Sequence, residues 1–385
     1  MAGLLRNPPL SLYVHMPWCV RKCPYCDFNS HAVPENLPAE KYIQALVADL
    51  EQDLPLAWGR PVKSIYFGGG TPSLFSADQI ADFLSAVRAR LDLSPGIEIT
   101  LEANPGTIEH DSFSAYAKAG INRVSLGVQS FDDGALKCIG RIHGRYEIEQ
   151  SLQSLQLAGI TNFNIDLMYA LPGQSPAQSK RDIDLAINAR PAHISFYQLT
   201  IEPNTVFAAQ PPQLPGDDSA WDMQQIGLDM LEAAGYGQYE ISAFAQRDMH
   251  SRHNMNYWRY GDFLAVGAGA HGKITTPSDG KVQRYAKHRH PKRYLQGLEN
   301  GDWQAERRFL GSEELIFEFF LNQLRLKQGV YIDDFSVRTG LLWQVVESRV
   351  QKAVEKGLLE VNGNRIITTG LGWKFVNDIQ QMFLP

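Results

Sequence analysis

Hydrophobic and polar positions alternate in a regular way along the first two thirds of the chain. Short runs rich in β-branched and aromatic residues predict strands at 12–15, 64–67, 98–102, 124–129, 162–167 and 193–199. Amphipathic segments between and after them predict helices at 39–54, 76–91, 111–119, 146–158, 176–189 and 219–234. Successive strand-then-helix units indicate parallel strands joined by helical crossovers.

The number of these units does not settle how the sheet closes. Eight units close a full barrel, and this pattern contains about six. An open doubly wound sheet shows the same alternation. The pattern therefore predicts an α/β fold and leaves an incomplete barrel and an open sheet as alternatives.

The pattern changes beyond about residue 235. A further strand is predicted at 236–242, residues 250–275 are rich in aromatic residues and glycine, and 281–293 holds six Lys or Arg and no acid. Helices are expected at 312–326, 332–339 and 342–356, followed by strands at 358–361 and 365–368 around an Asn362-Gly363 turn, and a last helix. Three helices and a hairpin resemble a winged helix. We therefore expect three parts, 1–235, 236–308 and 309–385.

Composition and charge narrow the class of protein. The chain has 385 residues, 44% hydrophobic and 20% charged, which excludes disorder as its main state. Its net charge is −6, whereas a general binder of phosphate backbones would carry a basic surplus. In the winged-helix-like part, Arg349, Lys352 and Lys356 are balanced by Glu347 and Glu355. We therefore expect no nucleic-acid partner.

The start of the chain and its cysteines bear on the compartment. Arg6, Pro8 and Pro9 interrupt any apolar stretch that would form a signal-peptide core. No run approaches the ~18 apolar residues that a membrane-spanning helix needs. Four cysteines in 385 residues cannot form a disulfide framework. These features lead us to expect a cytoplasmic protein.

Three of the four cysteines form a Cys19-x-x-x-Cys23-x-x-Cys26 motif just after the first predicted strand. A structural zinc site usually takes four protein ligands in two separated pairs, so His15 or His31 would have to complete it here. An iron–sulfur cluster with three cysteines leaves one iron without a protein ligand, where a small molecule can chelate. The spacing favours the cluster over zinc.

Polar or glycine-rich segments follow the predicted strands. Gly68-Gly69-Gly70-Thr71-Pro72 follows the second strand, and an absent Cβ lets a backbone approach a ligand closely. Further polar residues at or after strand ends are Glu102, Gln129, Arg141 and Asp166. Ligands bind at the carboxyl ends of the strands in parallel α/β folds. These residues therefore indicate one ligand site.

The cysteine spacing, Tyr25 before the last cysteine and the polar strand ends together resemble the radical S-adenosylmethionine (SAM) superfamily. The resemblance implies an α/β fold with an incomplete (βα)6 TIM-like barrel. It implies a 4Fe–4S cluster on Cys19, Cys23 and Cys26, with SAM chelating the open iron and yielding a 5′-deoxyadenosyl radical. The SAM residues that it implies are Tyr13, Tyr25, Gly69, Gly70, Thr71, Glu102, Gln129, Arg141, Asp166 and Thr200. Among these, Glu102 and Arg141 would hold the amino and carboxylate groups, and Gln129 and Asp166 the ribose hydroxyls.

Within the superfamily, the chain resembles the coproporphyrinogen-dehydrogenase-like branch. The oxidases of this branch carry a further cysteine two residues after the last cluster ligand, where this chain has Phe28, and they have a long N-terminal extension. The segment from His253 to Trp258 instead matches the HNxxYW motif of the heme chaperones of the branch, with Asn254 and Tyr257 at its other defining positions.

The motif implies a heme site. Imidazole is a good axial ligand for heme iron, so His253 is the candidate ligand, and nearby aromatic residues would pack on the macrocycle. Other histidines that compete as a second ligand are His250, His271, His288 and His290. The basic run 281–293 would meet heme propionates, a protein partner or anionic lipid, or form a solvated loop.

The resemblance therefore predicts a heme chaperone that binds heme, a 4Fe–4S cluster and SAM and delivers heme to respiratory hemoproteins. It further implies a homodimer that works near the membrane through its partners. Whether SAM is cleaved is open, and so is whether the protein is an enzyme. The alternatives are an oxygen-independent coproporphyrinogen III oxidase-like radical SAM enzyme, a related methyltransferase, and a zinc-dependent structural protein.

Overall fold

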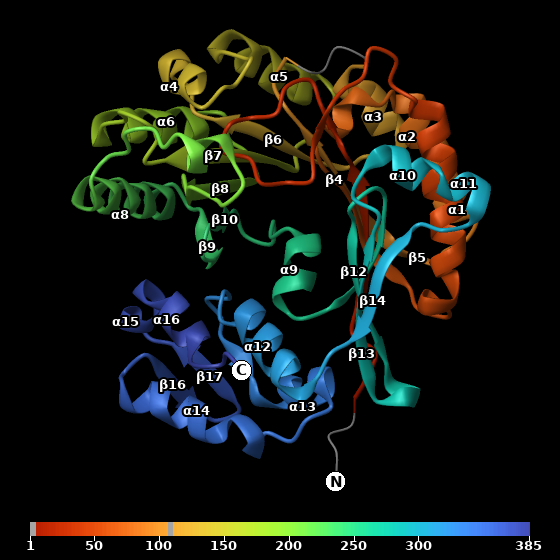
Figure 1. The fold of residues 1–385 in the computed structure, drawn as a ribbon. Helices are drawn as coiled ribbons and strands as arrows, with labels where there is room; N and C mark the ends of the chain where they lie inside the picture. Colours follow the sequence, from red (N-terminus) through yellow and green to blue (C-terminus); the bar gives the residue numbers. More distant parts are fainter. Residues whose placement is uncertain (1–4, 107–110) are drawn as a thin grey trace.

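A computed structural model describes residues 5–106 and 111–385, and its centre is a twelve-stranded sheet (Figure 1). The strand order is β14-β13-β12-β11-β1-β4-β5-β6-β7-β8-β10-β9. The six central strands are β1 (Leu10–Met16), β4 (Val62–Gly69), β5 (Leu93–Ala103), β6 (Arg123–Gln129), β7 (Phe163–Tyr169) and β8 (His193–Gln198). Each pairs in parallel with the next, which confirms the predicted (βα)6 sheet.

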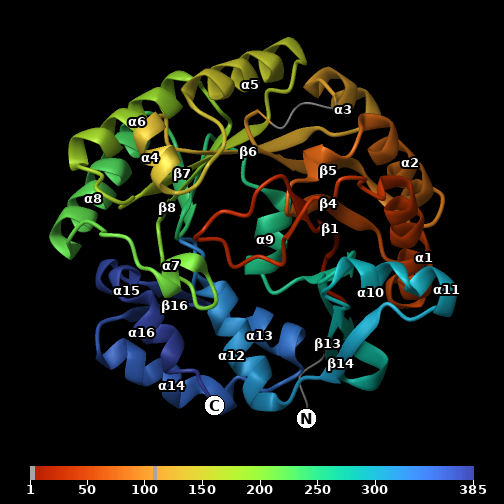
Figure 2. The same ribbon diagram turned by 45° about the horizontal axis from the view of Figure 1, so that its top comes forward.

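The crossover helices lie along the outer side of the curved sheet (Figure 2). They are α1 (Ala39–Ala57), α2 (Ala77–Arg88), α3 (Phe113–Ala119), α5 (Arg145–Leu157), α6 (Pro176–Asn188) and α8 (Asp217–Ala233). The shorter elements among them are β2 (Trp18–Cys19), β3 (His31–Ala32), η1 (Pro72–Leu74), α4 (Asp133–Cys138) and α7 (Val206–Ala209). Serine side chains cap the first turns of α2, α3 and α6, as the sequence pattern favours. The two edges of the sheet, β9 and β14, do not pair with each other, so the barrel is incomplete.

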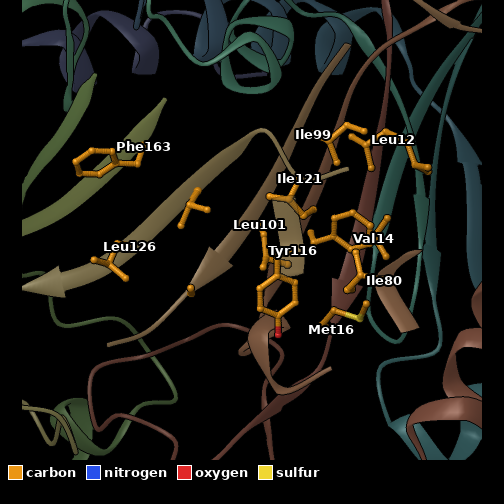
Figure 3. Packing of buried hydrophobic residues seen from close by; sticks show 14 of the residues in the cluster. Leu12, Val14, Met16, Ile80, Ile99, Leu101, Tyr116, Ile121, Leu126 and Phe163 are labelled. Carbon is orange, nitrogen blue, oxygen red and sulfur yellow. The ribbon is translucent and has the colours of Figure 1, made fainter. Parts of the chain in front are cut away.

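Alternation along the strands separates the core from the interior of the barrel. Apolar positions such as Leu12, Val14, Ile99 and Leu101 pack outward with helix residues such as Ile80 (Figure 3). The intervening positions face the interior because successive side chains of a strand point to opposite faces. These interior positions include Ser11, Tyr13 and His15 on β1, Ser64 and Tyr66 on β4, and Glu102 on β5. The interior therefore carries polar groups, whereas the outer layer is apolar, with aliphatic and aromatic side chains.

Residues 237–309 extend this sheet at both edges. Their elements are β9 (Gly237–Glu240), β10 (Ala243–Ala245), α9 (Arg252–Trp258), β11 (Asp262–Val266), β12 (His271–Thr276), η2 (Pro277–Asp279), β13 (Lys281–Lys287), α10 (Pro291–Leu295), α11 (Gly297–Asn300) and β14 (Gln304–Phe309). The strand predicted at 236–242 is present as β9, and a turn at 241–242 leads into β10, which pairs with it in antiparallel. Helix α9 sits inside the curve of the sheet (Figures 1 and 2).

The basic run 281–293 forms β13 and the start of α10, so the alternative of a solvated loop is wrong. Strand β13 pairs with neighbours on both sides. Three cations of the basic run form ion pairs. Arg284 pairs with Glu318, Lys287 with Asp49 and Asp53, and Arg293 with Asp302. Much of the positive charge that looks continuous in the sequence is therefore balanced in the fold.

The C-terminal part has its own hydrophobic core and the predicted winged-helix-like arrangement. Its elements are α12 (Ser312–Gln323), β15 (Val330–Tyr331), α13 (Ile332–Thr339), α14 (Gln344–Glu355), β16 (Leu359–Asn362), β17 (Arg365–Thr368), α15 (Gly370–Lys374) and α16 (Val376–Gln381). The predicted hairpin is present, with β16 and β17 antiparallel. Arg325 pairs with Glu240 of β9, which ties this part to the sheet. Among the described helices, none is long and apolar enough to cross a bilayer.

Candidate functional site

A cavity of about 320 Å³ opens at the carboxyl ends of the parallel strands, where the loop between β1 and α1 crosses the sheet (Figure 2). The predicted cluster and SAM residues that line it are Cys19, Cys23, Tyr25, Cys26, Gly69, Gly70, Thr71, Glu102, Gln129, Arg141, Asp166 and Thr200. They come from separate strands and from loops far apart in the sequence. Parallel strands bring them together because their carboxyl ends share one edge of the sheet.

The three cysteines of the motif share one wall of this cavity. Cys19, Cys23 and Cys26 are half-buried, and the backbone N–H of Cys26 donates to the carbonyl of Cys23 at 3.2 Å in a tight turn. Burial raises the pKa of the Cys19 and Cys26 thiols, and the neighbouring thiols raise it further. Cys138 is exposed at the end of α4, outside the cavity lining.

The arrangement of the thiols distinguishes the two metal alternatives. Within residues 5–106 and 111–385, no three His, Cys, Asp or Glu side chains converge on a position for a single metal ion. A tetrahedral zinc site is therefore not preformed in the described part of the chain. Three thiols that line the same cavity fit a cluster, because each cysteine then binds a different iron.

The glycine-rich loop after β4 packs against the loop after β1. The backbone N–H of Gly70 donates to the carbonyl of Met16 at 2.7 Å, and Gly69 adopts a φ of 110°. A Cβ on Gly69 would collide with the ring of His15, and one on Gly70 with the carbonyl of Trp18. Glycine is therefore required at both positions. Because these residues have no side chain, their backbone groups face the cavity directly.

Glu102 lies at the junction of β4 and β5. Its carboxylate accepts hydrogen bonds from the Tyr66 hydroxyl at 2.8 Å and from the Gly69 N–H at 3.1 Å. Burial raises the pKa of Glu102 to about 7, and the charge of Asp166 contributes in the same direction. A ligand group that donates a hydrogen bond or carries positive charge would favour the ionised carboxylate.

Arg141 is linked through Asn104 to Thr71 of the glycine-rich loop. Its Nη1 donates to the Asn104 Oδ1 at 2.7 Å, and the Asn104 Nδ2 donates to the Thr71 Oγ1 at 3.1 Å. The Arg141 Nε is buried and has no hydrogen-bond partner among the described residues. A buried donor without a partner is costly, so this atom is suited to bind an acceptor on a ligand. Asn104 was missed in the sequence, although it follows Glu102 by two positions and is the first residue after β5.

Gln129 ends β6, and Asp166 lies in the middle of the neighbouring strand β7. Gln129 has a φ of 70°, which is strained for a residue with a side chain, and its Oε1 accepts from the Tyr197 hydroxyl at 2.7 Å. Asp166 accepts from the Asn164 Nδ2 at 2.7 Å, and burial raises its pKa. Tyr197 lines the cavity and was also missed, since a tyrosine in a buried strand carries no distinctive sequence signal.

A second cavity of about 560 Å³ adjoins the first and shares Asp27, Phe28, Gly69 and Glu102 with it. Tyr13, the one predicted SAM residue outside the first cavity, lines the second. Its other lining residues are His15, Asn29, Tyr257, Phe263, Gly269, His271 and Arg289. The second cavity therefore combines aromatic walls with imidazole and guanidinium groups.

His253 of the predicted heme motif is buried against the inner face of β4, with 1% of its surface exposed. Its Nδ1 lies 3.0 Å from the Ser64 Oγ, and its ring stacks on Tyr66 at 4.8 Å between centroids. Its Nε2 is also buried and has no partner in the described chain. Burial lowers the pKa of His253 to about 3, so the ring is neutral at neutral pH. The Glu98 carboxylate accepts the backbone N–H of His253 at 3.0 Å and anchors the start of α9.

The other motif residues point in different directions from α9. Tyr257 packs on Phe263 at 4.3 Å between ring centroids and lines the second cavity. Trp258 contacts the C-terminal part, because the Arg325 guanidinium lies over its ring with the Cζ atom 4.3 Å from the ring centroid. Asn254 is half-buried beside the Ser251 cap, whose hydroxyl accepts the Asn254 N–H. The structure thus places Tyr257 at the cavity and packs His253 and Trp258 away from it.

Comparisons with known proteins agree with this architecture. Residues 13–186 match the radical SAM superfamily, and residues 310–375 match the HemN C-terminal domain. The chain is 46% identical over 381 residues to the heme chaperone HemW of Escherichia coli (strain K12), covering 99% of this chain and 100% of the relative. It is 34% identical to the mitochondrial radical S-adenosyl methionine domain-containing protein 1 of Mus musculus, covering 97% and 87%.

A solved structure extends the likeness to three dimensions. The coproporphyrinogen III oxidase (HemN) of Escherichia coli superposes with a TM-score of 0.82 at 25% identity, covering 98% of this chain and 90% of that chain. The fold described above, including the C-terminal part, is therefore shared by a chaperone group and an oxidase.

Proposed function

Because the chain belongs to the radical SAM superfamily and, within it, to the family of the heme chaperone HemW, we propose that it is itself a heme chaperone. In this proposal it binds heme, a 4Fe–4S cluster and SAM, and it delivers heme to respiratory hemoproteins in the cytoplasm. Full-length identity of 46% to a curated heme chaperone is the observation that carries the proposal. The two adjoining cavities provide places for the cofactors and the cargo.

The first cavity suits the cluster and SAM. Cys19, Cys23 and Cys26 would hold the cluster, and the open iron would leave room for the methionine end of SAM. When bound, the cluster supplies an electron, and SAM supplies the sulfonium that this electron can cleave. Glu102 can accept a hydrogen bond from an amino group there, and the Arg141 Nε can donate one to a carboxylate.

The remaining polar residues of the first cavity suit the nucleoside end of SAM. Gln129 and Asp166 present amide and carboxylate oxygens from adjacent strands, which matches a pair of ribose hydroxyls. Tyr25 and Thr200 would border the pocket and exclude water, and Gly69, Gly70 and Thr71 would supply backbone contacts. Tyr13 contributes from the second cavity.

The heme motif enters the proposal through the second cavity. Tyr257 and Phe263 form an aromatic wall, and Asn254 and Trp258 hold α9 in place behind it. His253 would reach a heme only if α9 turned, because its Nδ1 faces Ser64 and its Nε2 is buried. In the described arrangement, His253 supports Tyr257 edge-on at 4.9 Å between ring centroids.

Porphyrinogen oxidation is the second candidate, since the likeness to the solved oxidase covers nearly the whole chain. Phe28 bears on this alternative. It is 60% exposed and borders both cavities, at the position where the resemblance places a further cysteine in the oxidases. A thiol is therefore replaced by an apolar ring at the entrance, which favours binding a flat apolar cargo over redox chemistry.

The proposal also includes a homodimer and peripheral contact with the membrane through partner proteins. Light scattering of the reconstituted protein gives its mass in solution. Flotation with vesicles of neutral or anionic lipid measures direct membrane binding, which we expect to be weak because ion pairs balance much of the basic run.

One experiment separates chaperone from oxidase. The anaerobically reconstituted protein is titrated with hemin and is assayed for turnover of coproporphyrinogen III, with the His253→Ala variant alongside. We expect stoichiometric hemin binding and no porphyrinogen turnover. Robust production of protoporphyrinogen would contradict the chaperone proposal, and so would the absence of hemin binding by the wild type.

A further inference from the structure

We propose that heme occupies the second cavity with His271 as its axial iron ligand and Arg289 as the partner of its propionates. This inference rests on the proposed heme-binding function and assigns its site. It places the ligand outside the HNxxYW motif, at the first residue of β12.

His271 is the imidazole of the second cavity whose nitrogens are uncommitted. It is exposed at the start of β12, and neither ring nitrogen makes a hydrogen bond within the described residues. His15 also lines the cavity, but its Nδ1 is bonded to the Tyr13 hydroxyl at 3.0 Å and its Nε2 to the Asn29 carbonyl at 2.9 Å. An axial ligand needs an accessible nitrogen lone pair, which His271 offers and His15 does not.

His253 of the motif is placed less well to bind iron. Its Nδ1 lies 3.0 Å from the Ser64 Oγ, and its Nε2 is buried, so neither nitrogen faces the second cavity in the described structure.

The walls of the cavity match the shape and charge of heme. Tyr257, Phe263 and the exposed ring of Phe28 provide aromatic surface for a flat macrocycle. A volume of about 560 Å³ lies within the usual range for small-molecule sites. The apolar faces of a porphyrin would thus find aromatic surface on the side of α9 and at the entrance.

Charge sets the orientation of the cargo. The carboxylates Asp27 and Glu102 border the first cavity as well, whereas Arg289 and His271 belong to the second alone. In the described chain, no carboxylate lies within ion-pair distance of the Arg289 guanidinium, although other cations of the basic run are paired. Two propionates would therefore turn towards Arg289 and away from the cluster cavity.

The test uses the reconstituted protein with its cluster and SAM. Hemin is titrated into the wild type, His271→Ala, and His250→Ala as a matched control, since His250 is exposed and lies outside both cavities. We expect His271→Ala to weaken hemin binding by about tenfold or more and to shift the Soret band, because loss of a ligand costs at least as much as loss of its supporting contacts. Added imidazole should restore the band in His271→Gly.

A second variant tests the propionate contact. Arg289→Gln should weaken binding of hemin but not of hemin dimethyl ester, and the Soret band should keep its wild-type position. If the wild type binds hemin and His271→Ala binds it equally well, this inference is overturned and the proposed function still stands. No hemin binding by the wild type would overturn both.

Discussion

The cavity at the strand ends and the helix α9 both hold side chains that suit ligand binding, but the fold treats them in opposite ways. At the strand ends, Glu102, Arg141 and Asp166 border one open cavity. On α9, His253 is buried against β4, and Trp258 packs under Arg325. The first set is arranged around empty space, and the second is arranged around neighbouring side chains.

The difference lies in what each region must satisfy. Glu102 and Asp166 point from paired strands into the interior of the barrel, and Arg141 reaches the cavity from the loop after α4, so these side chains can face a ligand. Helix α9 is wedged between the barrel interior and the C-terminal part, so its side chains fill the contacts on both sides. A sequence motif such as HNxxYW therefore includes residues that pack in the core as well as residues that can bind a ligand. Burial of each side chain decides which of them can reach the ligand.

The largest expected effect concerns the cysteines of the cavity. Replacing Cys19, Cys23 or Cys26 with Ser should abolish the iron and sulfide content of the anaerobically reconstituted protein, because a cluster with two protein ligands is not held. Iron and sulfide analysis measures this directly. Cys138→Ser should retain the wild-type content, and a loss there would show that the exposed cysteine takes part.

The buried histidine of α9 should matter first for stability. His253→Ala removes a fully buried ring that stacks on Tyr66 and leaves Ser64 without this partner, so we expect a loss of about 2–4 kcal/mol in the free energy of unfolding. The control His250→Ala removes an exposed ring and should cost less than about 1 kcal/mol. Urea denaturation compares them. Equal midpoints for wild type and His253→Ala would contradict the described packing.

The glycine loop tests how tightly the cavity wall is built. Gly69→Ala should weaken SAM binding by about tenfold, or 1.4 kcal/mol, because the new Cβ would displace His15 and the loop. Gly370→Ala is the control, since a Cβ there meets open space outside both cavities. Equilibrium binding of SAM to the reconstituted protein provides the measurement. Unchanged affinity in Gly69→Ala would show that the loop does not contact SAM.

The last expected effect is a pH dependence at Glu102, which changes SAM affinity without removing any contact. Burial raises its pKa from the ordinary value of 4.5 to about 7, so the free protein holds a proton on this carboxyl between those values. A bound amino group favours the ionised form, and SAM affinity should therefore rise with pH from 5 to 7, by at most about tenfold per unit from this group. Glu102→Gln cannot ionise and should show a shallower slope. Identical slopes would mean that Glu102 does not face the amino group.

The periodicity of the chain was enough to predict the central architecture. The predicted strands and helices of the first two thirds are present, since each has one apolar side and this side repeats at the period of its element. The hairpin at Asn362-Gly363 is present for a similarly local reason. Strand β10 was not predicted, because it has only three residues and is held by antiparallel pairing with β8 and β9, which a run this short does not reveal in the sequence.

Sequence reasoning placed the strand-end residues but not their supports. Glu102 stands out at the end of a strand, whereas Asn104 and Tyr197 look like ordinary strand or loop residues until Arg141 and Gln129 are seen to bond to them. The basic run 281–293 shows the opposite case. It looks like one patch, but Asp49, Asp53, Glu318 and Asp302 reach it from distant parts of the chain.

The sequence by itself determined the family, the parallel α/β core and the residues around the cluster cavity, because local periodicity and short motifs carry that information. Only the tertiary structure decided which side chains are accessible. It buried His253 of α9 against β4 and left His271 facing a cavity, although the sequence alone offers both as candidate heme ligands. Accessibility depends on packing between segments far apart in the chain, which no local pattern records.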